Sequence, residues 1–432
     1  MTQRAFFAFF ALALSTSGAA AGDAVSSTAP ATSAPTAPPA AEATARSGMK
    51  HPEPPCADIK PDCALTVSPA IDRKGRLFVA FTVGKSVYVA ASSDGGRSCA
   101  PPATIATIGD GTIDSHGDAR PKVVALNDGG LIASYTTRPD KQMIGTIFTA
   151  RSTDGGKTFS PPQAMLSEGG QRFEAFTVSP KGRIYAGWLD KTHALKAKAE
   201  GREFAGSGVA FATSDDGGAT FKGKSILMDH ACECCKMSAA IDRDGQAVFA
   251  WRQVFEDGAR DHYAARLSAD GATLSGGRVS DDNWVINACP HQGPSLAIDR
   301  AGVWHLAWFT KGKTRQGLFY AQSRDNGKSF STPEKIGDDA RAPSFAALLA
   351  TKDRLYRVWK EFDGTTTTVP MQMSRDGGKN WSAPRVMASA ADAADSPQLV
   401  DDGRRAFLSW AAHREGYRLI PLPRDEKSAD AR

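Results

Sequence analysis

The sequence predicts an all-β fold, a β-propeller for which seven four-stranded blades are favoured and six remain the alternative. A short turn motif, Ser-X-Asp-Gly-Gly or a close variant, recurs with its aspartates at Asp94, Asp154, Asp216, Asp270, Asp325 and Asp376. The steps between these aspartates are 60, 62, 54, 55 and 51 residues. Each copy follows a hairpin of apolar, β-branched or aromatic strands. Repeats of this length, built from short strands and turns, are typical of propellers.

The first 21 residues have the pattern of a Sec-type signal peptide. A charged start precedes an apolar run from Ala5 to Leu14 and small residues up to a cleavage point after Ala21. That run is too short to span a membrane, and no other reaches about 18 residues. Residues 22–50, rich in Ala, Pro, Ser and Thr, have the composition of a disordered linker. The expected protein is periplasmic or secreted and has no membrane span.

The propeller is predicted to cover residues 51–423, followed by a flexible tail over 424–432. Alternation of apolar and polar residues marks seven hairpins, which lie at 69–81, 122–135, 176–188, 239–251, 295–308, 347–359 and 397–410. Seven hairpins but only six turn motifs leave the last unit, 397–423, without a fourth strand. Residues 51–65 are expected to supply that strand and so close the ring without an exposed sheet edge.

The residue types of the turn motif explain its shape. The Asp carboxylate and Ser hydroxyl can accept backbone N–H groups, and Gly supplies the positive φ that a tight turn needs. Copies such as Ser152 to Phe159 and Ser374 to Trp381 resemble the Asp-box, or BNR repeat, of the sialidase superfamily. The resemblance covers residues 63–423. It implies boxes between the third and fourth strands of each blade, on the face away from the ligand site.

Composition narrows the choice of partner. The chain has 52 Lys and Arg against 47 Asp and Glu, a formal charge of +5 over 432 residues. It contains no run of basic residues of the kind that follows phosphates, so nucleic acid is not an expected partner. With 41% apolar residues, it is long enough to bury a large core as one repeat domain.

Sulfur and imidazole side chains gather just before the fourth and fifth hairpins. The two segments run from Met228 to Met237 (MDHACECCKM) and from Asn287 to Gly293 (NACPHQG). Aligned hairpins place Cys232 and Cys289 at equivalent positions, so adjacent blades should present them side by side. In an extended strand, Cys232 and Cys234 would share one face and Cys235 would point to the other.

A Cys/Met/His group suits a soft metal, because thiolate and thioether select Cu(I) and imidazole accepts copper or zinc. The predicted ligands, with copper as the favoured metal, are Cys232, Cys234, Cys235 and Cys289, supported by Met228, Met237, His230 and His291. An exported protein meets oxidants, so the same four cysteines could instead form two disulfides or remain free thiols.

The other three cysteines have separate expectations. Cys56 and Cys63 flank a Pro-containing loop and are predicted to form a disulfide, with membership of the metal group as the alternative. Cys99 replaces the aromatic residue of the first turn motif and is expected to be a buried apolar residue.

The resemblance also implies a hydrolase reading. Family sialidases bind the substrate carboxylate with three arginines and use a Tyr nucleophile and an Asp acid/base, which suits an anionic sugar. The candidates at comparable positions are Arg120, Arg172 and Arg341, with Asp114, Asp118 and Glu174 as acid groups. The family's Arg-Ile-Pro motif is absent, and the most similar segment is Ala119-Arg120-Pro121. No tyrosine can be assigned as the nucleophile.

Three functional hypotheses follow. The favoured one is an exported sialidase-superfamily propeller that binds a soft metal, copper, through the Cys/Met/His cluster at its channel mouth. The alternative is an exo-acting glycoside hydrolase, exo-α-sialidase-like, with an acidic carbohydrate as ligand. The third is a propeller whose flat face binds another exported protein. Whether the chain is an enzyme is therefore left open by its sequence.

Overall fold

The computed structural model describes residues 58–139, 144–167 and 170–424, and the structural statements below concern these residues. The predicted signal peptide (1–21), the predicted linker (22–50) and Cys56 lie outside them, as does the tail after Arg424. All described residues belong to one compact unit, Glu53–Arg432.

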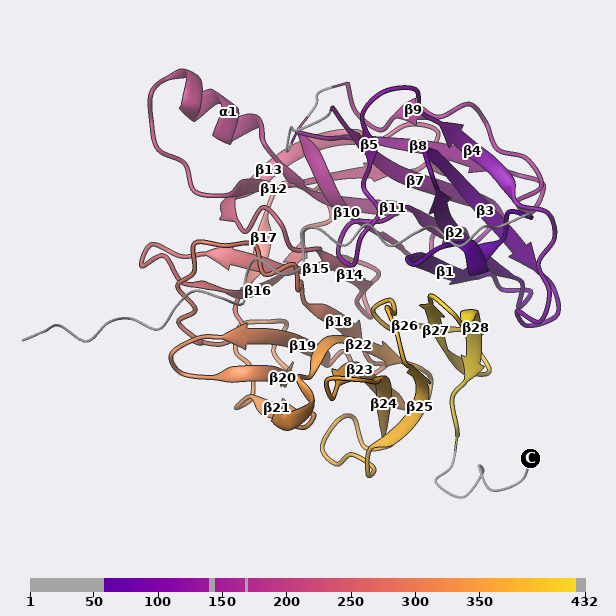
Figure 1. Ribbon diagram of the computed structural model, residues 1–432. Coiled ribbons are helices and arrows are strands. Elements are labelled where there is room, and N and C mark those ends of the chain that lie inside the picture. The colour runs from indigo at the N-terminus through magenta and orange to yellow at the C-terminus, as the bar shows by residue number, and fades with distance from the viewer. Residues whose placement is uncertain (1–57, 140–143, 168–169, 425–432) are drawn as a thin grey trace, which may run out of the picture. The chain divides into compact units, whose positions relative to one another are not determined.

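Antiparallel strands follow one another along the chain and pair with their sequence neighbours (Figure 1). Seven successive meanders are present in the described ranges: β1 (Val67–Ile71), β2 (Leu77–Val83), β3 (Ser86–Ser92) and β4 (Ala103–Thr107); β5 (Thr112–Ile113), β6 (Lys122–Ala125), β7 (Leu131–Arg138), β8 (Thr146–Ser152) and β9 (Gln163–Ala164); β10 (Gln171–Val178), β11 (Ile184–Asp190), β12 (Ser207–Ser214) and β13 (Lys222–Ala231); β14 (Ser238–Ile241), β15 (Ala247–Val254), β16 (Arg260–Leu267) and β17 (Leu274–Arg278); β18 (Ser295–Ile298), β19 (Trp304–Lys311), β20 (Gln316–Ser323) and β21 (Glu334–Ile336); β22 (Ser344–Ala350), β23 (Leu355–Phe362), β24 (Thr367–Ser374) and β25 (Arg385–Ala390); β26 (Gln398–Asp401), β27 (Ala406–Ala412) and β28 (Gly416–Pro421).

Helices are few and short. The helix α1 (Thr192–Ala199) follows β11 and contacts β12, and two 3-10 turns are η1 (Pro61–Cys63) and η2 (Asp339–Arg341). The fold is therefore all-β, as predicted.

The first strands of the meanders bring the meanders together. Contacts join β1 to β6, β10 to β14, β14 to β18, β18 to β22 and β22 to β26, and β26 in turn contacts β1. The third and fourth meanders are also joined by strand pairing, between Ala231 in β13 and Gln253 in β15. The segments just before these first strands are the ones that hold the candidate site residues.

The core lies between the meanders because the second strand of each is buried on both faces. Five of these strands carry a tryptophan that is at most 1% exposed: Trp188, Trp251, Trp308, Trp359 and Trp410. Each indole N–H has an acceptor, as a buried tryptophan requires.

The repeated turns follow the third strand of their meander, and one hydrogen-bond pattern explains them. In the second copy, Ser152 Oγ donates to Asp154 and accepts from the amide of Gly156, while Asp154 accepts from the amide and hydroxyl of Thr158. The same set recurs around Asp94, Asp216 and Asp325. It also recurs around Asp376, where the side-chain amide of Asn380 takes the place of the hydroxyl. The pattern holds the pKa of Asp154 well below its usual range, chiefly through the Thr158 hydroxyl.

The glycine of one such turn is a sharp test of this packing. Gly327 has φ of 80°, and a Cβ built on it would lie 2.3 Å from Cζ3 of the buried Trp304 ring. We expect Gly327→Ala to lower the free energy of unfolding by about 2–4 kcal/mol, because left-handed strain adds to overpacking. Gly403→Ala is the control. It has φ of 79° and no atom within 4 Å, so only about 1–2 kcal/mol of strain is expected. Equal losses in urea unfolding would contradict the role given to the Trp304 contact.

The seventh meander differs from the expectation. The described part of the chain before β1 does not pair with β28 as a fourth strand. It forms η1 instead, whose Asp62 carboxylate accepts the amide of Tyr417 in β28. Pro61 at the start of this turn fixes φ and removes a donor that a strand would need. The last sheet thus has three strands in the described ranges.

Candidate functional site

Three buried thiols lie together between β13 and β14. The Sγ atom of Cys232 is 3.6 Å from that of Cys234 and 3.9 Å from that of Cys235. All three Sγ atoms lie within 4.8 Å of one another, and each residue is at most 1% exposed. We call these three residues the thiol trio. It is the one cluster of three or more potential metal-ligating Cys, His, Asp and Glu side chains found in the described ranges.

A tight turn produces this convergence. The chain leaves β13 at Ala231 and turns at residues 233–235 before it enters β14 at Ser238. The expectation of an extended segment, with Cys235 on the face opposite to Cys232 and Cys234, is therefore wrong. The turn rotates Cys235 back toward the other two sulfur atoms.

The turn is fixed to the second strand of the fourth meander. Ala231 pairs with Gln253 in β15, and the amide of Cys232 donates to the carbonyl of Arg252 at 2.8 Å. Gln253 also donates from its side chain to the carbonyl of Asp229 at 2.6 Å. Backbone contacts on a buried strand thus hold the thiols in place, a rigid support of the kind that metal sites need.

Two arginines bring positive charge to the thiol trio. Arg260 lies with Nη1 3.6 Å from Cys232 Sγ and 3.2 Å from the carbonyl of Ala288. Arg252 is 1% exposed and donates to the carbonyls of Arg260, Gln292 and Phe309. In the part of the chain that the structure describes, neither guanidinium has a carboxylate partner.

Of the three thiols, only that of Cys232 has a lowered pKa. Hydrogen bonds from Cys234 and Cys235, followed by the charges of Arg252 and Arg260, lower the pKa of Cys232. The same interaction with Cys232 raises the pKa of Cys234, and burial raises the pKa of Cys235. Cys232 is therefore the thiol that ionises first.

The other predicted ligands lie outside the thiol trio. Cys289, which was expected beside Cys232, is exposed and is not a member of the thiol trio. His230 is exposed and packs on the Phe204 ring, with Nδ1 3.0 Å from the carbonyl of Ala205. The ring of His291 contacts the backbone of the trio: its Nδ1 atom lies 3.0 Å from the carbonyl oxygen of Cys234.

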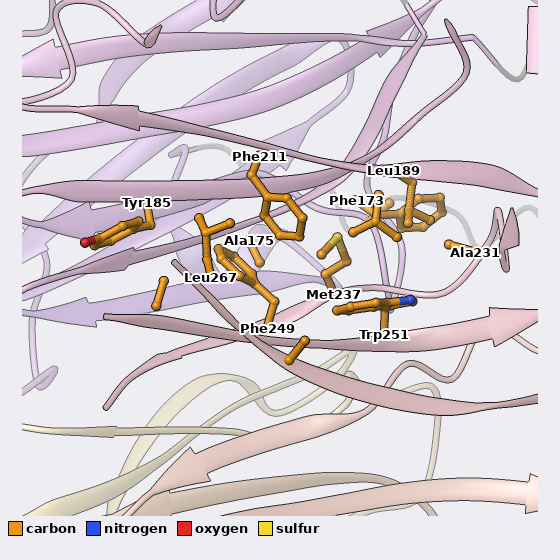
Figure 2. Close-up of a cluster of buried hydrophobic side chains, with 14 residues drawn as sticks. Phe173, Ala175, Tyr185, Leu189, Phe211, Ala231, Met237, Phe249, Trp251 and Leu267 are labelled. Carbon is orange, nitrogen blue, oxygen red and sulfur yellow. The ribbon is translucent and has the colours of Figure 1, made fainter. Parts of the chain in front are cut away.

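The two methionines belong to the core. Met237 lies among Phe211, Phe249 and Trp251, as Figure 2 shows, and is 4% exposed. Met228 is a partly buried neighbour of the same cluster. Their side chains are used for packing: Met237 lies directly before β14, where the chain enters the core.

Among the described cysteines, only Cys63 is disulfide-bonded. Cys232, Cys234, Cys235 and Cys289 are all free thiols, and so is the half-buried Cys99, which packs against the core cluster that includes Leu77 and Val79. The alternative of two disulfides among the first four is therefore not realised. Cys63 is disulfide-bonded, and its predicted partner, Cys56, lies outside the described residues.

Asp118 connects the segments around the thiol trio. One carboxylate oxygen, Oδ2, accepts the amide of Lys236 at 3.1 Å and the amide of Gly293 at 2.8 Å. The other, Oδ1, is buried without a hydrogen-bond partner in the described ranges. Burial raises the pKa of this carboxyl. Asp118 thus holds the thiol turn and the His291 loop together.

The three candidate arginines of the hydrolase reading are each paired with carboxylates. Arg120 makes a bidentate pair with Asp395, at 2.7 and 2.8 Å, and is buried with it. Arg172 pairs with Asp114 at 2.8 Å. Arg341 pairs with Glu361 and Asp363. These pairs supply internal ties and do not show a free carboxylate-binding triad.

The acid candidates are engaged as well. Asp114 accepts from both Arg138 and Arg172. Glu174 accepts from the hydroxyls of Ser134 and Thr136 and lies 3.7 Å from Lys122 Nζ. Each therefore has a structural partner.

Arg252, Arg260 and Asp395 are the site residues that sequence reasoning missed. Arg252 follows the strand tryptophan Trp251 directly, and the strand register that brings it to Cys232 is not visible in the sequence. Asp395 is 275 residues from Arg120. Only the spatial return of β26 to β1 brings those two side chains together.

Comparison with known proteins shows the fold. The sequence matches no protein-family profile and no curated protein. Solved structures do match: a PL25 ulvan lyase bound to -[GlcA(1-4)Rha3S]- (12% identity, 83% of this chain and 94% of that chain, TM-score 0.56) and the polysaccharide lyase Uly1 (8% identity, 83% and 90%, TM-score 0.52). The Hadza microbial sialidase Hz136 matches at 16% identity, over 77% and 75%, with a TM-score of 0.46.

Identities this low show the fold alone. Among the described helices, none is both long and apolar enough to cross a membrane. The chain therefore has an all-β fold of antiparallel sheets that is similar to the fold of the two polysaccharide lyases.

Proposed function

We propose that this protein binds Cu(I) through the thiol trio of Cys232, Cys234 and Cys235. The spacing of the sulfur atoms is the observation that carries the proposal. A metal–thiolate bond of about 2.3 Å places the sulfurs of a trigonal or tetrahedral site about 3.8–4.0 Å apart. The observed 3.6 and 3.9 Å fit that geometry and exceed the bond of about 2.05 Å in a disulfide.

The number and softness of the donors favour copper. Thiolates select soft ions such as Cu(I), whereas a structural zinc site takes four protein ligands. Within the described ranges the cluster offers three. A trigonal Cu(I) site needs no fourth.

Charge balance supports the same ion. Three thiolates and one Cu(I) carry two negative charges, and Arg252 and Arg260 supply two positive ones beside Cys232. Arg252 is buried with carbonyl partners only, and a buried cation without a counter-charge is costly. Thiolate ligands would provide that counter-charge.

The wider setting of the proposal is an exported binding protein. We place the site at one mouth of a seven-bladed propeller, closed where β26 contacts β1. The turn motifs and the signal-peptide pattern of residues 1–21 support the sialidase-superfamily and periplasmic or secreted assignments. The proposal does not include a hydrolase activity, because the arginines that such an activity requires are paired internally.

Copper stoichiometry tests the proposal. The full mature chain, reduced and anaerobic, is titrated with Cu(I) against a chromophoric Cu(I) chelator. We expect the wild type to hold one Cu(I) per chain against the chelator, and Cys232→Ser/Cys234→Ser/Cys235→Ser to hold none against it. The exposed Cys289→Ser and the distant Cys99→Ser are matched controls, and both should keep the full stoichiometry. A wild-type protein that holds no Cu(I) against the chelator, or a triple variant that still does, contradicts the proposal.

A further inference from the structure

The thiol trio is covered, which raises the question of how a metal reaches it. Its three residues are at most 1% exposed. A metal site needs an access route as well as ligands. The route must therefore start at partly exposed donors next to the turn that holds the thiols.

Two histidines lie at that place. His116 comes from the loop before β6 and His291 from the loop before β18, and their ring centroids are 5.5 Å apart at an interplanar angle of 79°. We call them the histidine pair. His116 is half-buried and His291 is exposed, so the pair reaches from solvent inward.

His291 has the second bond that is typical of a ligating histidine. Its Nδ1 lies 3.0 Å from the carbonyl of Cys234, which fixes the tautomer with Nδ1–H as donor and leaves Nε2 as a free lone pair. That carbonyl belongs to the central residue of the thiol trio. The same bond thus orients the imidazole and holds it against the backbone of the turn that carries the thiols.

His116 is held in place by its backbone and by the packing of its ring, and not through its ring nitrogens. Its backbone amide donates to the carbonyl of Ala119 at 2.6 Å, and its ring packs edge-on against Phe173 with centroids 6.2 Å apart. Neither ring nitrogen has a hydrogen-bond partner in the described ranges. An imidazole held by packing, with free nitrogens beside a second imidazole, is ready to bind a metal.

The backbone around the pair is strained. His291 has φ of 49° and Phe173 has φ of 60°, values that non-glycine residues rarely adopt. Such residues gather at functional sites, where the surrounding structure holds them in place. Here the Asp118 carboxylate, which accepts the amides of Lys236 and Gly293, ties the loop of His291 to the turn of the thiols.

We infer that His116 and His291 form an outer two-imidazole copper site that receives Cu(I) and passes it to the thiol trio. Imidazole accepts copper, and two such ligands suffice for a transient Cu(I) complex. The transfer exchanges nitrogen for thiolate ligands without a change of oxidation state, and the thiols that bind the copper release their protons to the solvent. This inference rests on the proposed function of the thiol trio.

Uptake kinetics test the transfer. Reduced full-length mature protein is mixed with a chelator complex of Cu(I) under anaerobic stopped flow, and equilibrium competition is measured on the same samples. We expect His116→Gln and His291→Gln to slow uptake by about tenfold or more while the equilibrium affinity stays unchanged. His230→Gln, an exposed histidine near the same turn, is the control and should leave the rate unaltered. Unchanged rates, or rates and affinities that fall together, overturn the inference.

A second arm keeps the inference testable by itself. In the Cys232→Ser/Cys234→Ser/Cys235→Ser background we expect one weakly held Cu(I), competed by millimolar imidazole and lost when His116→Gln or His291→Gln is added. The absence of this weak site overturns the histidine pair and leaves the thiol trio standing. A wild type whose only copper is this weak site instead overturns the proposed function and leaves the pair.

Discussion

Cys234→Ser should weaken Cu(I) binding by more than about 100-fold, beyond the 10- to 100-fold range that the loss of an outer partner of a metal ligand causes. Cys234 is the central residue of the turn and is 0% exposed, with its sulfur 3.6 Å from that of Cys232. Serine keeps the shape but replaces a soft thiolate by a hard hydroxyl, which Cu(I) binds poorly. Competition against a Cu(I) chelator of known affinity measures the change.

The matched substitution for Cys234→Ser is Cys289→Ser. Alignment of the fourth and fifth hairpins of the chain made Cys289 the equivalent of Cys232, yet Cys289 is exposed and lies outside the thiol trio. Its replacement should change the Cu(I) affinity by less than the error of the competition. An equal loss at Cys289 and Cys234 would show that the binding center includes the exposed thiol, and the three-sulfur site would be wrong.

Arg120→Met should lower the free energy of unfolding by about 3–5 kcal/mol, because it leaves the carboxylate of Asp395 buried without its partner. The two side chains are 5% and 1% exposed. Arg120 also donates to the carbonyl of Val67, and Asp395 accepts the amide of Val67. The pair therefore ties the segments before β6 and β26 to β1, and its loss should loosen the contact between the first and last sheets.

Urea unfolding of Arg120→Met, Asp395→Leu and the double variant measures this effect. The double variant should lose less than the sum of the two single losses, since neither partner is left as a lone buried charge. Arg183→Met is the control: its pair with Asp215 is open to solvent, at 38% and 64% exposure, and should be worth about 1 kcal/mol or less. A substrate-binding Arg120 would predict near-wild-type stability for Arg120→Met, and that result would reopen the hydrolase reading.

Local signals allowed the strands and turns to be predicted. Alternation of apolar residues marked the hairpins, and Ser, Asp and Gly at fixed offsets marked turns whose hydrogen bonds, as at Ser152 and Asp154, lie within five residues. The fourth strand expected for the last meander does not form from residues 58–65, the described part of the segment 51–65. No local pattern in residues 58–66 predicts that Asp62 will accept the amide of Tyr417, which is 355 residues away in the sequence.

The candidate site was predicted in composition but not in geometry. The run from Cys232 to Cys235 identified the right segment. Strand periodicity then placed Cys235 on the wrong face, because the chain turns there. Cys289 and Met237 have side chains that suit a soft metal, yet Cys289 is exposed and Met237 packs in the core with Phe249. Arg252 went unnoticed since its approach to Cys232 depends on the pairing of Ala231 with Gln253, a contact between meanders.

X-ray absorption at the copper edge of the anaerobically loaded, full mature protein tests the binding center most directly. Three sulfur neighbours at about 2.3 Å around a single Cu(I) are the predicted result. A first shell of nitrogen or oxygen, or copper held with only one sulfur neighbour, would contradict it.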